Sequence, residues 1–585
     1  MLFFDFEVFS HDWLVVISDP INKVEYCIRN NIDDLRNLHE KHKDDIWVGY
    51  NTRGYDQYIL KALLCGFDAK VMNDFIIKEG KKGWQFSNLL RTIPLNNYDV
   101  MTSFHSLKQL EGFMGNSIEE TPVPFDIDRP LTPSEVKDVF KYCRHDVEQT
   151  IEVFLKRKEE FDSHLSLIKT FNLPLSFIGK TKAQLAAVIL GAYKQPHKDE
   201  FNLILPDTLE IKKYKEVVDW YENPVNHDYT KVLNCEVAGL PHVFAWGGLH
   251  GAILKYYGEG YFLNVDVASY YPALMIEYDF LSRNVGNPKK YEEIRDTRLK
   301  LKADKNPMQA PYKIVLNSTY GAMKDKYNNL FDPRQANNVC IGGQLLLLDL
   351  IEHLEDHCQL IQSNTDGLII KLHNENDYEL IDDLCYEWEK RTRMQLEFVE
   401  YRRIFQKDVN NYVIVDLDDN YESKGGYVKK LDDLDYDLPI VNEAIKECLF
   451  NGVHPKQTIE ECDNLREFQK IVKISSKYLY ALYSPTITQE KIRDDGGRLK
   501  TIKKFTGGQK QHEKCFRVFA SNLKTDGGIY KVKNHRKNPE KFQDTPLHCF
   551  IENGDVNDKP VPEKLDRSWY VKLAVKRLRD FGIRL

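Results

Sequence analysis

Three short segments in the middle of the chain carry the residue types that phosphoryl-transfer chemistry needs. NVDVASYYP places Asp266 at the end of an apolar run that predicts a β-strand. KIVLNSTYG places Lys313, Asn317 and Tyr320 at i, i+4 and i+7, on one face of a predicted helix. QSNTDGLII places Asp366 in a tight polar turn between two apolar runs. Carboxylates on strand ends can hold metal ions and a nearby lysine can neutralise a triphosphate, so the segments predict nucleotidyl transfer.

A second set of acids lies near the N-terminus. Asp5 and Glu7 are two residues apart in LFFDFEVF, a strand pattern that turns both side chains to the same face. Asp56 follows in VGYNTRGYDQYIL, and Asp146 comes four residues after Tyr142 in YCRHDVEQT. Acids between apolar strand residues are costly unless metals or partners neutralise them. Four carboxylates and one phenol can bind two divalent ions and orient a water for phosphodiester hydrolysis.

Taken in order, the three middle segments resemble motifs A, B and C of family B DNA polymerases. The N-terminal acids resemble the three motifs of a proofreading 3′→5′ exonuclease domain: Asp-x-Glu, Asn51-x-x-x-Tyr55-Asp56, and Tyr142-x-x-x-Asp146. The segment SLKQLEGFMG between the second and third motifs is also typical of that domain. The chain thus resembles a compact family B polymerase with proofreading, of the kind found in bacteriophages and other mobile elements.

The resemblance covers nearly the whole chain, most firmly residues 1–150 and 245–430. It implies an α/β multidomain fold, in which a ribonuclease H-like exonuclease domain precedes a right-hand polymerase with palm, fingers and thumb. The expected parts are an exonuclease domain over 1–162, a connecting region with a Gly-Gly linker over 163–250, a palm over 251–289 and 346–435, fingers over 290–345, and a thumb with a basic C-terminal DNA-binding region over 436–585.

The resemblance also assigns roles to single residues. Asp266 and Asp366 would hold the metal ions of polymerisation, and Asp5, Glu7, Asp56 and Asp146 those of the exonuclease. Tyr142 would orient the attacking water or the scissile phosphate. The expected nucleotide-binding residues are Lys313 on the triphosphate, Tyr271 as the steric gate against a ribose 2′-OH, and Asn317, Tyr320 and Arg298.

Four further residues are expected to contact DNA: Gly247, Gly248, Tyr412 and Lys424. The glycine pair in FAWGGLHGA is similar to a linker that touches the template between the two modules, although Ala245 stands at its usual tyrosine position. A turn that merely needs glycine for a positive φ explains the pair equally well. Tyr412 and Lys424 lie in a predicted hairpin and match a Lys/Tyr cluster that touches the primer.

Motif C departs from the family pattern. The usual turn is Asp-Thr-Asp-Ser, whereas this chain has Asn364-Thr365-Asp366-Gly367. Asn364 can offer an amide oxygen but brings no charge, so activity is expected while metal preference and rate stay open. Gly367 fits a tight hairpin with Asp-Gly at its tip. We interpret the change as a variant of a subfamily.

Composition sets wider bounds. A length of 585 residues predicts about three or four domains, and 42% hydrophobic with 29% charged residues is typical of a soluble enzyme. No apolar run reaches about 18 residues, so no membrane span is expected, and neither is a cleaved signal peptide. The eleven cysteines are scattered without a C-x-x-C pair, which indicates a reducing cytoplasm, that of the bacterial host for a phage protein.

The net charge of −8 hides a basic stretch. Between Arg498 and Lys541 there are 13 Lys or Arg against 3 Asp or Glu, a local balance of +10. Such a stretch can follow a phosphate backbone, and the alternative is a solvated charged surface. The expected partners are primer-template DNA and dNTPs, without a membrane and with a monomeric enzyme. The expected cofactor is Mg²⁺, two ions per active site, with Mn²⁺ as an alternative.

Two other functions stay open. The protein could be a 3′→5′ exonuclease with an inactive, DNA-binding polymerase module, which Asn364 alone favours. It could also be a primase-polymerase, against which the tyrosine at position 271 argues. The motif spacings are short, 47 residues from Asp266 to Lys313 and 46 from Tyr320 to Asp366. They leave no room for the long insertions of protein-primed members, so ordinary primed synthesis is expected.

Overall fold

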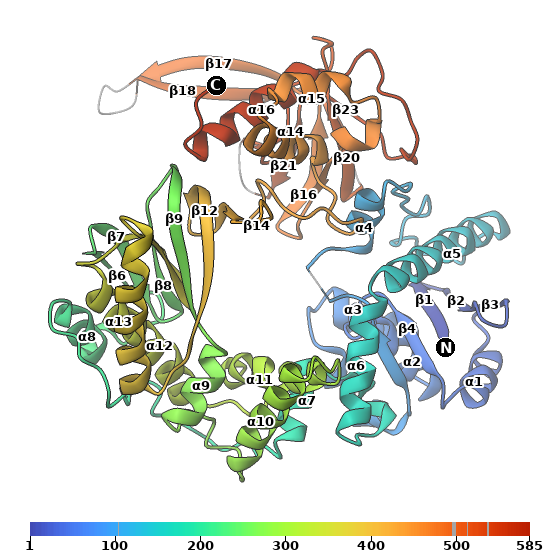
Figure 1. Cartoon of the computed structure of the whole chain (residues 1–585). Coiled ribbons are helices and arrows are strands. Elements are labelled where there is room, and N and C mark those ends of the chain that lie inside the picture. Colours follow the sequence, from blue (N-terminus) through green and yellow to red (C-terminus); the bar gives the residue numbers. More distant parts are fainter. Residues whose placement is uncertain (103, 494–498, 512, 535–537) are drawn as a thin grey trace. The chain divides into compact units, whose positions relative to one another are not determined.

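The structure is a computed structural model that describes residues 1–102, 104–493, 499–511, 513–534 and 538–585. It is a mixed α/β multidomain protein (Figure 1). The chain divides into two compact units, and each gathers stretches that are far apart in the sequence. The first unit comprises Met1–Asp162, Pro174–Gly179 and Leu431–Ala574, and the second comprises Ser163–Leu173, Lys180–Lys430 and Val575–Leu585. Within the described residues, no helix has both the length and the apolar character needed to cross a bilayer.

The N-terminal part of the first unit is built on a sheet with the order β3-β2-β1-β4-β5. Side chains alternate along its central strand β1 (Leu2–Val8), where Phe4 and Phe6 pack into the core. Asp5 and Glu7 turn to the other face. β1 pairs antiparallel with β2 and parallel with β4. The remaining strands are β2 (Trp13–Asp19), β3 (Val24–Arg29), β4 (Ile46–Gly49) and β5 (Asn96–Asp99).

Helix α5 (Pro133–Lys156) carries two of the predicted site residues and starts at a well-defined cap. The Thr132 hydroxyl accepts a hydrogen bond from the Glu135 N–H at 3.3 Å, and the Glu135 carboxylate reaches back to the Thr132 N–H at 2.8 Å. Pro133 occupies the first helical position, where its missing N–H costs nothing. The other helices of this part are α1 (Ile32–Lys41), α2 (Asp56–Leu64), α3 (Ala69–Ile77), α4 (Leu107–Met114) and the start of α6 (Lys158–Thr170).

The C-terminal stretch of the first unit begins with α14 (Pro439–Asn451) and α15 (Pro455–Glu461) and continues mainly as strands. These strands form a sheet β15-β20-β23, a sheet β19-β16-β21-β22 and the hairpin β17-β18. Residues 498, 512 and 535–537 of the basic stretch lie outside the described residues. The sequence predicted the basic character of this stretch but not its strands. The strands are β15 (Lys470–Lys473), β16 (Tyr478–Tyr483), β17 (Thr486–Arg493), β18 (Leu499–Thr506), β19 (Gln509–Gln511), β20 (Cys515–Ala520), β21 (Ile529–Lys533), β22 (Glu540–Lys541) and β23 (Cys549–Ile551).

A buried arginine joins the two parts of the first unit. Arg517 on β20 is fully buried and donates through Nη2 to the carbonyl oxygens of Gly112 and Asn116, at 3.2 and 2.7 Å. Its Nε donates to Gln469 Oε1 at 3.1 Å, and its Nη1 donates to the Gly554 carbonyl. The guanidinium therefore connects the end of α4 with the C-terminal strands through hydrogen bonds that no other side chain could supply in the same geometry.

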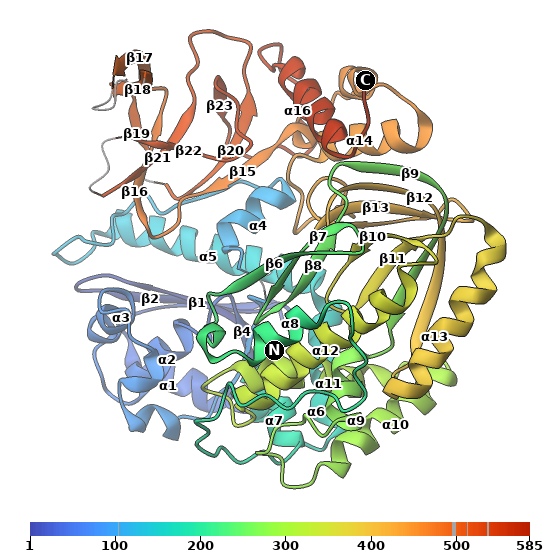
Figure 2. The same ribbon diagram turned by 90° about the vertical axis from the view of Figure 1, so that its left-hand side faces the viewer.

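The second unit contains a sheet with the order β14-β13-β12-β9-β11-β10-β8-β7-β6 (Figure 2). All of the neighbouring pairs are antiparallel. Its long central strands are β9 (Tyr256–Val267) and β12 (Leu396–Asp408). The others are β6 (Val232–Val237), β7 (Leu240–Ala245), β8 (Gly248–Ala252), β10 (Gln359–Ser363), β11 (Gly367–Lys371), β13 (Asn411–Asp416) and β14 (Tyr421–Lys424).

The helices of the second unit centre on α12 (Pro333–Leu354), which is buried along almost its whole length. Asp332 caps it by accepting from the Gln335 N–H. The connecting region expected over 163–250 includes a helix, α8 (Lys215–Glu222), because Val217 and Tyr221 bury one face. The other helices are α7 (Lys182–Ile189), α9 (Tyr270–Glu277), α10 (Lys289–Ala303), α11 (Gln309–Lys324), α13 (Tyr378–Thr392) and the end of α16 (Arg567–Asp580).

We expect Arg517→Met to destabilise the protein strongly. Methionine fills a similar volume but leaves several buried carbonyl oxygens without a donor, which should lower the free energy of unfolding by about 3–5 kcal/mol. Urea unfolding followed by circular dichroism measures this. The matched control is Arg36→Met on the exposed surface of α1, for which we expect a change below about 0.5 kcal/mol. An equal effect of both substitutions would contradict the joining role of Arg517.

Candidate functional site

Two carboxylates of the second unit meet on neighbouring strands. Asp266 lies near the end of β9, and Asp366 lies in the turn between β10 and β11. The strand register sets Asp266 opposite Gly367. The backbone N–H of Val267 donates to the Asp366 carbonyl oxygen at 2.9 Å, which fixes the turn against the end of β9. The structure thus brings together two acids that are 100 residues apart in the sequence.

Gly367 gives Asp266 the space that its carboxylate occupies. A Cβ atom built on Gly367 would lie 1.9 Å from Asp266 Oδ1 and 2.8 Å from the Val265 carbonyl oxygen. Real side chains do not approach so closely, so serine at position 367 would displace the Asp266 carboxylate. Turn geometry alone had explained this glycine from the sequence, and the structure adds a steric reason.

The surroundings of Asp266 disfavour its charge. Burial and the Asp366 carboxylate raise the pKa of Asp266 to about 6, against a hydrogen bond from Asn264 Nδ2 to Oδ2 at 2.6 Å. Glu397 lies directly across from Asp266 on β12 and also raises this pKa. Sequence reasoning missed both neighbours. Asn264 could have been found, since it stands two residues before Asp266 on the same face, whereas only the register identifies Glu397.

A cavity of about 290 Å³ opens beside Asp366 and beside Val267, the residue that follows Asp266. Tyr271 on α9 and Tyr320 on α11 contact each other in its wall, with ring centroids 4.4 Å apart and ring planes at 56°. Burial raises the pKa of both phenols, so both stay protonated at neutral pH. The cavity is therefore bounded by carboxylate on one side and by neutral rings on another. Its lining consists of Val267, Ser269, Tyr270, Tyr271, Pro272, Leu316, Asn317, Tyr320, Thr365 and Asp366.

Three of the predicted nucleotide-binding residues differ in whether they line this cavity. Lys313 and Asn317 are exposed on α11, and only Asn317 is among the lining residues. Arg298 on α10 is buried, and its Nη1 donates to Ser269 Oγ at 2.9 Å. Ser269 adopts a left-handed conformation (φ 49°) at the start of α9, which places its hydroxyl in this wall. Arg298 thus reaches the cavity wall through Ser269, and Lys313 stands outside the lining.

The predicted DNA-contacting residues flank the two carboxylates. Gly247 lies in the β7–β8 turn and Gly248 begins β8, and a Cβ on Gly248 would lie 3.5 Å from Thr365 Oγ1 in the turn that holds Asp366. Gly248 has a φ of 156°. Tyr412 pairs with Lys424 across β13 and β14, with Lys424 Nζ 6.0 Å from its ring centroid. Burial raises the pKa of Tyr412, and the charges of Asp266 and Asp366 raise it further.

The four predicted acids of the first unit also converge. Asp5 and Glu7 lie on β1, Asp56 begins α2, and Asp146 lies on α5. Asp56 Oδ1 accepts a hydrogen bond from the Phe6 N–H at 3.1 Å, which ties α2 to β1. Burial first and mutual repulsion next raise the pKa of Asp5 and Glu7 well above their ordinary values. Burial is also the main cause that raises the pKa of Asp56 to about 7 and that of Asp146 to about 6.

One lysine lies among these acids. Lys108 Nζ donates to Asp146 Oδ1 and to Glu111 Oε1, the latter at 3.0 Å, and lies 4.7 Å from the Tyr142 ring centroid. Burial alone would lower the pKa of Lys108, but the Asp146 and Glu111 carboxylates raise it overall. Lys108 and Glu111 belong to the SLKQLEGFMG segment, which sequence reasoning noted as a whole without singling them out. Their i, i+3 spacing on α4 was the available signal.

A divalent cation fits this arrangement of carboxylates. The ligand atoms of Asp5, Glu7 and Cys143 lie within 4.8 Å of one another, and so do those of Glu111, His145 and Asp146. One lysine does not balance so many buried carboxylates, and oxygen ligands suit Mg²⁺ or Mn²⁺. The Cys143 thiol is a soft donor, and burial raises its pKa well above the ordinary value. The acids of the second unit, Asp266 and Asp366, offer oxygen ligands of the same kind.

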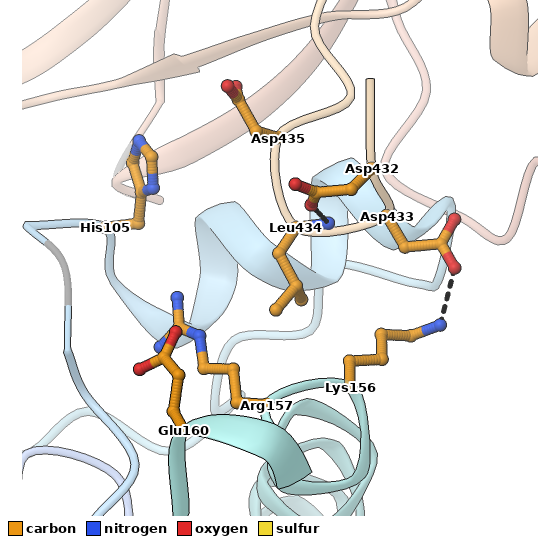
Figure 3. Close-up of a pocket in the computed structure, with 8 residues that line it drawn as sticks. All are labelled: His105, Lys156, Arg157, Glu160, Asp432, Asp433, Leu434 and Asp435. Atoms are coloured by element: carbon orange, nitrogen blue, oxygen red, sulfur yellow. Dashed lines mark hydrogen bonds and ion pairs between the residues drawn. The ribbon is translucent and has the colours of Figure 1, made fainter. Parts of the chain in front are cut away.

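A further cavity in the first unit, of about 540 Å³, is lined by several acids (Figure 3). Hydrogen bonds and ion pairs within the fold account for two of them. Asp432 accepts from the Leu434 N–H at 2.7 Å, and Asp433 pairs with Lys156 at 2.6 Å and with Arg466 at 2.7 Å. These interactions hold the 432–435 turn against the end of α5. None of the predicted site residues is among the described residues that line it, so we do not place a site there.

Comparisons with known proteins find similarity among solved structures but not among sequences. No protein-family model matches the chain, and no curated protein sequence is similar to it. Among solved structures, the chain is similar to the family B DNA polymerase from the hyperthermophilic archaeon Pyrobaculum calidifontis. The two share 14% sequence identity with a TM-score of 0.40, over 100% of this chain and 78% of that one.

The raised pKa of Asp56 predicts a pH-dependent stability. The folded protein holds this carboxyl at a pKa of about 7 against an ordinary 3.8. The contribution of this carboxyl to the free energy of unfolding is therefore complete below its ordinary pKa of 3.8. It is lost as the pH rises through the folded-state pKa of about 7. We expect the metal-free protein in EDTA to melt at a lower temperature at about pH 8 than at about pH 5. Asp56→Asn should reduce the underlying difference in the free energy of unfolding by a few kcal/mol.

Mg²⁺ or Mn²⁺ should restore the melting temperature of the wild type at the higher pH, because a bound cation favours the ionised carboxylates. The control is Asp126→Asn, which removes an exposed acid of the same unit. Identical pH profiles for the wild type and Asp56→Asn would contradict the assignment.

Proposed function

We propose that the chain is a template-directed DNA polymerase that extends a primer 3′-OH with dNTPs and carries a 3′→5′ exonuclease in its first unit. The observation that supports the polymerase most directly is the meeting of Asp266 and Asp366 on neighbouring strands, beside a cavity walled by Tyr271 and Tyr320. The family resemblance of the motifs supports the same activity. In this proposal the parts expected from the sequence, from the exonuclease domain at 1–162 to the thumb at 436–585, keep their assignments.

In the proposed polymerisation, the primer 3′-oxygen attacks the α-phosphate of a dNTP, a phosphodiester bond forms and pyrophosphate leaves. Mg²⁺ ions held by Asp266 and Asp366 would supply stabilisation of the charge on the attacking and leaving oxygens. Lys313 would neutralise triphosphate charge as a point cation, and Arg298 would support that side of the pocket through Ser269. Tyr271, held against Tyr320, would exclude a ribose 2′-OH by its bulk.

In the proposed exonuclease, water attacks the terminal phosphodiester of a DNA strand and the 3′-oxygen of the preceding nucleotide leaves. Asp5, Glu7, Asp56 and Asp146 would hold Mg²⁺, or Mn²⁺ in its place. The Tyr142 hydroxyl would orient the water or the phosphate. Lys108 holds the Asp146 carboxylate in place through a charge-assisted hydrogen bond. The substrates of both activities, primer-template DNA and dNTPs, are the proposed partners of a monomer that replicates phage or mobile-element DNA in the cytoplasm.

A second candidate is a 3′→5′ exonuclease whose polymerase module only binds DNA. Asn364 favours it, because this amide stands where a second turn carboxylate is usual and brings no charge to the site. The acids in the first unit would then carry the whole activity. The presence of Asp266, Asp366, Lys313 and Tyr320 favours the polymerase.

Primer extension distinguishes these candidates. We expect the wild type with Mg²⁺ to extend a recessed, labelled primer when dNTPs are present and to degrade it when they are absent. Asp366→Asn should lower extension by about 100-fold or more and leave degradation intact, whereas Asp56→Asn should do the reverse. Degradation under every condition, with no extension even in Mn²⁺, would overturn the polymerase and establish the exonuclease alone.

The space beside Asp266 gives a second test. Gly367→Ala should lower extension at least about tenfold, because the added methyl group displaces the Asp266 carboxylate. Exonuclease activity should change by less than about twofold, since the acids of the first unit are untouched. The control is Gly286→Ala, where a Cβ has no neighbouring atom within 4 Å. Full extension by Gly367→Ala would show that the carboxylate does not need its present position.

A further inference from the structure

A buried histidine bridges two strands of the large sheet in the second unit. His242 on β7 is 1% exposed and pairs with Gly251 on β8. Gly251 in turn pairs with Ser363, the last residue of β10. The imidazole of His242 lies across Gly251, and its Nε2 is 2.7 Å from Ser363 Oγ. Alternate strands of a sheet lie about 9.5 Å apart, a distance that an imidazole, one hydrogen bond and a hydroxyl span together.

The absence of a side chain at Gly251 gives the imidazole its place. A Cβ atom on Gly251 would lie 2.2 Å from His242 Nε2 and 2.3 Å from its Cε1, closer than real side chains approach. Gly251 has no positive φ, so the reason for glycine here is space rather than backbone conformation. The Phe244 ring stacks near the imidazole, with centroids 6.1 Å apart and planes at 25°. Gly251 and Phe244 thus fix the ring over β8.

The two hydrogen bonds of this imidazole determine which nitrogen carries the proton. His242 Nδ1 lies 3.0 Å from the Leu240 carbonyl oxygen, which can only accept, so Nδ1 is the donor. Burial lowers the pKa of His242, so the ring is neutral and Nε2 has a free lone pair. The Ser363 hydroxyl therefore donates to Nε2. Ser363 is fully buried, where a hydroxyl without an acceptor would be costly.

Ser363 leads directly into the turn that carries Asp366. The Asn364 N–H donates to the Gly367 carbonyl oxygen at 2.9 Å and closes this turn. Asp366 lies next to Asp266, whose pKa its charge raises, so the two carboxylates repel each other. The turn must be held against that repulsion. His242 holds the strand that enters the turn, on the side away from β11.

Stability alone gives little reason for this pair. A buried hydrogen bond between neutral groups contributes only a small net free energy, and two apolar side chains of the same shape would serve nearly as well. A fully satisfied polar pair instead specifies one arrangement, because its hydrogen bond has a direction. Here that arrangement sets the position of the end of β10.

We propose that His242 is a positioning residue of the polymerase site, which fixes Ser363 and thereby the turn that presents Asp366. The inference rests on the proposed polymerase function and adds a residue of β7 to the machinery of that site. His242 acts through Ser363 and does not contact the substrate.

Single-nucleotide incorporation measures the effect on the reaction. We expect His242→Ala to lower kcat about tenfold or more, because a small displacement of a metal-binding carboxylate is costly. The KM for the dNTP should change by less than about threefold, since Tyr271, Tyr320 and Lys313 lie on α9 and α11. Exonuclease activity should stay within about twofold of the wild type. An unchanged kcat would overturn the proposal.

Two variants separate the hydrogen bond from a general loss of stability. His242→Gln keeps a neutral acceptor for the Ser363 hydroxyl and should recover kcat to within about threefold of the wild type. Val237→Ala removes buried methyl groups from β6 of the same sheet. It should lower the melting temperature but leave kcat within about twofold. Equal losses of kcat in His242→Ala and Val237→Ala would overturn the proposal.

A reciprocal pair of substitutions tests the crossing over β8. Gly251→Ala should lower kcat about as much as His242→Ala, because the new methyl group displaces the imidazole from Ser363. Once the imidazole is gone the methyl group has room, so the double variant should lose no more than about twofold beyond His242→Ala. Losses that multiply in the double variant would overturn the coupling. The control is Gly286→Ala, where a Cβ has no neighbouring atom within 4 Å.

Hydrogen exchange of the full chain in EDTA tests the positioning without any catalysis. Mass spectrometry of peptides that cover residues 360–370 reports on the turn. Its amide groups should exchange at least about tenfold faster in His242→Ala than in the wild type, and at the wild-type rate in Val237→Ala. Equal exchange in the wild type and His242→Ala would overturn the proposal. If the wild type extends no primer, the polymerase function fails, whereas hydrogen exchange still decides whether His242 holds the turn.

Discussion

Holding like-charged carboxylates close together is the constraint on which both sites of this protein depend. Burial and repulsion by neighbouring carboxylates favour the protonated form, as the raised pKa values of Asp56, Asp146 and Asp266 indicate. Such clusters persist only when contacts of the surrounding fold hold the carboxylates in place. Here that fold consists of β1 with α2 and α5 in the first unit and of β9 with the β10–β11 hairpin in the second.

The two units reduce the repulsion between their carboxylates in different ways. In the first unit, Lys108 places a positive charge inside the cluster, and the Phe6 N–H donates to Asp56. In the second unit, the acids lie closer to solvent, Asn264 donates to Asp266, and the missing side chain of Gly367 leaves room for the carboxylate. Asn364, two residues before Asp366 in the β10–β11 turn, carries no charge and so adds nothing to the repulsion there.

The first unit joins residues from both ends of the chain, and this has a consequence for its chemistry. Helix α4 packs against β15 and β20, and Arg517 fixes its end by hydrogen bonds to Gly112 and Asn116. The same helix carries Lys108 toward the acids. The C-terminal strands thus help to position a residue of the N-terminal acidic cluster.

The sequence by itself determined the residues that could do chemistry and the local elements that carry them. The alternation of LFFDFEVF predicted a strand with Asp5 and Glu7 on one face, and the spacing in KIVLNSTYG predicted the helix that presents Lys313, Asn317 and Tyr320, because both periodicities are properties of the backbone. Only the tertiary structure decided which distant residues meet: Gly367 and Glu397 on either side of Asp266, Lys108 on Asp146, and Arg517 on α4. These contacts depend on strand register and on packing between segments 38 to 405 residues apart, and no local pattern encodes either of them.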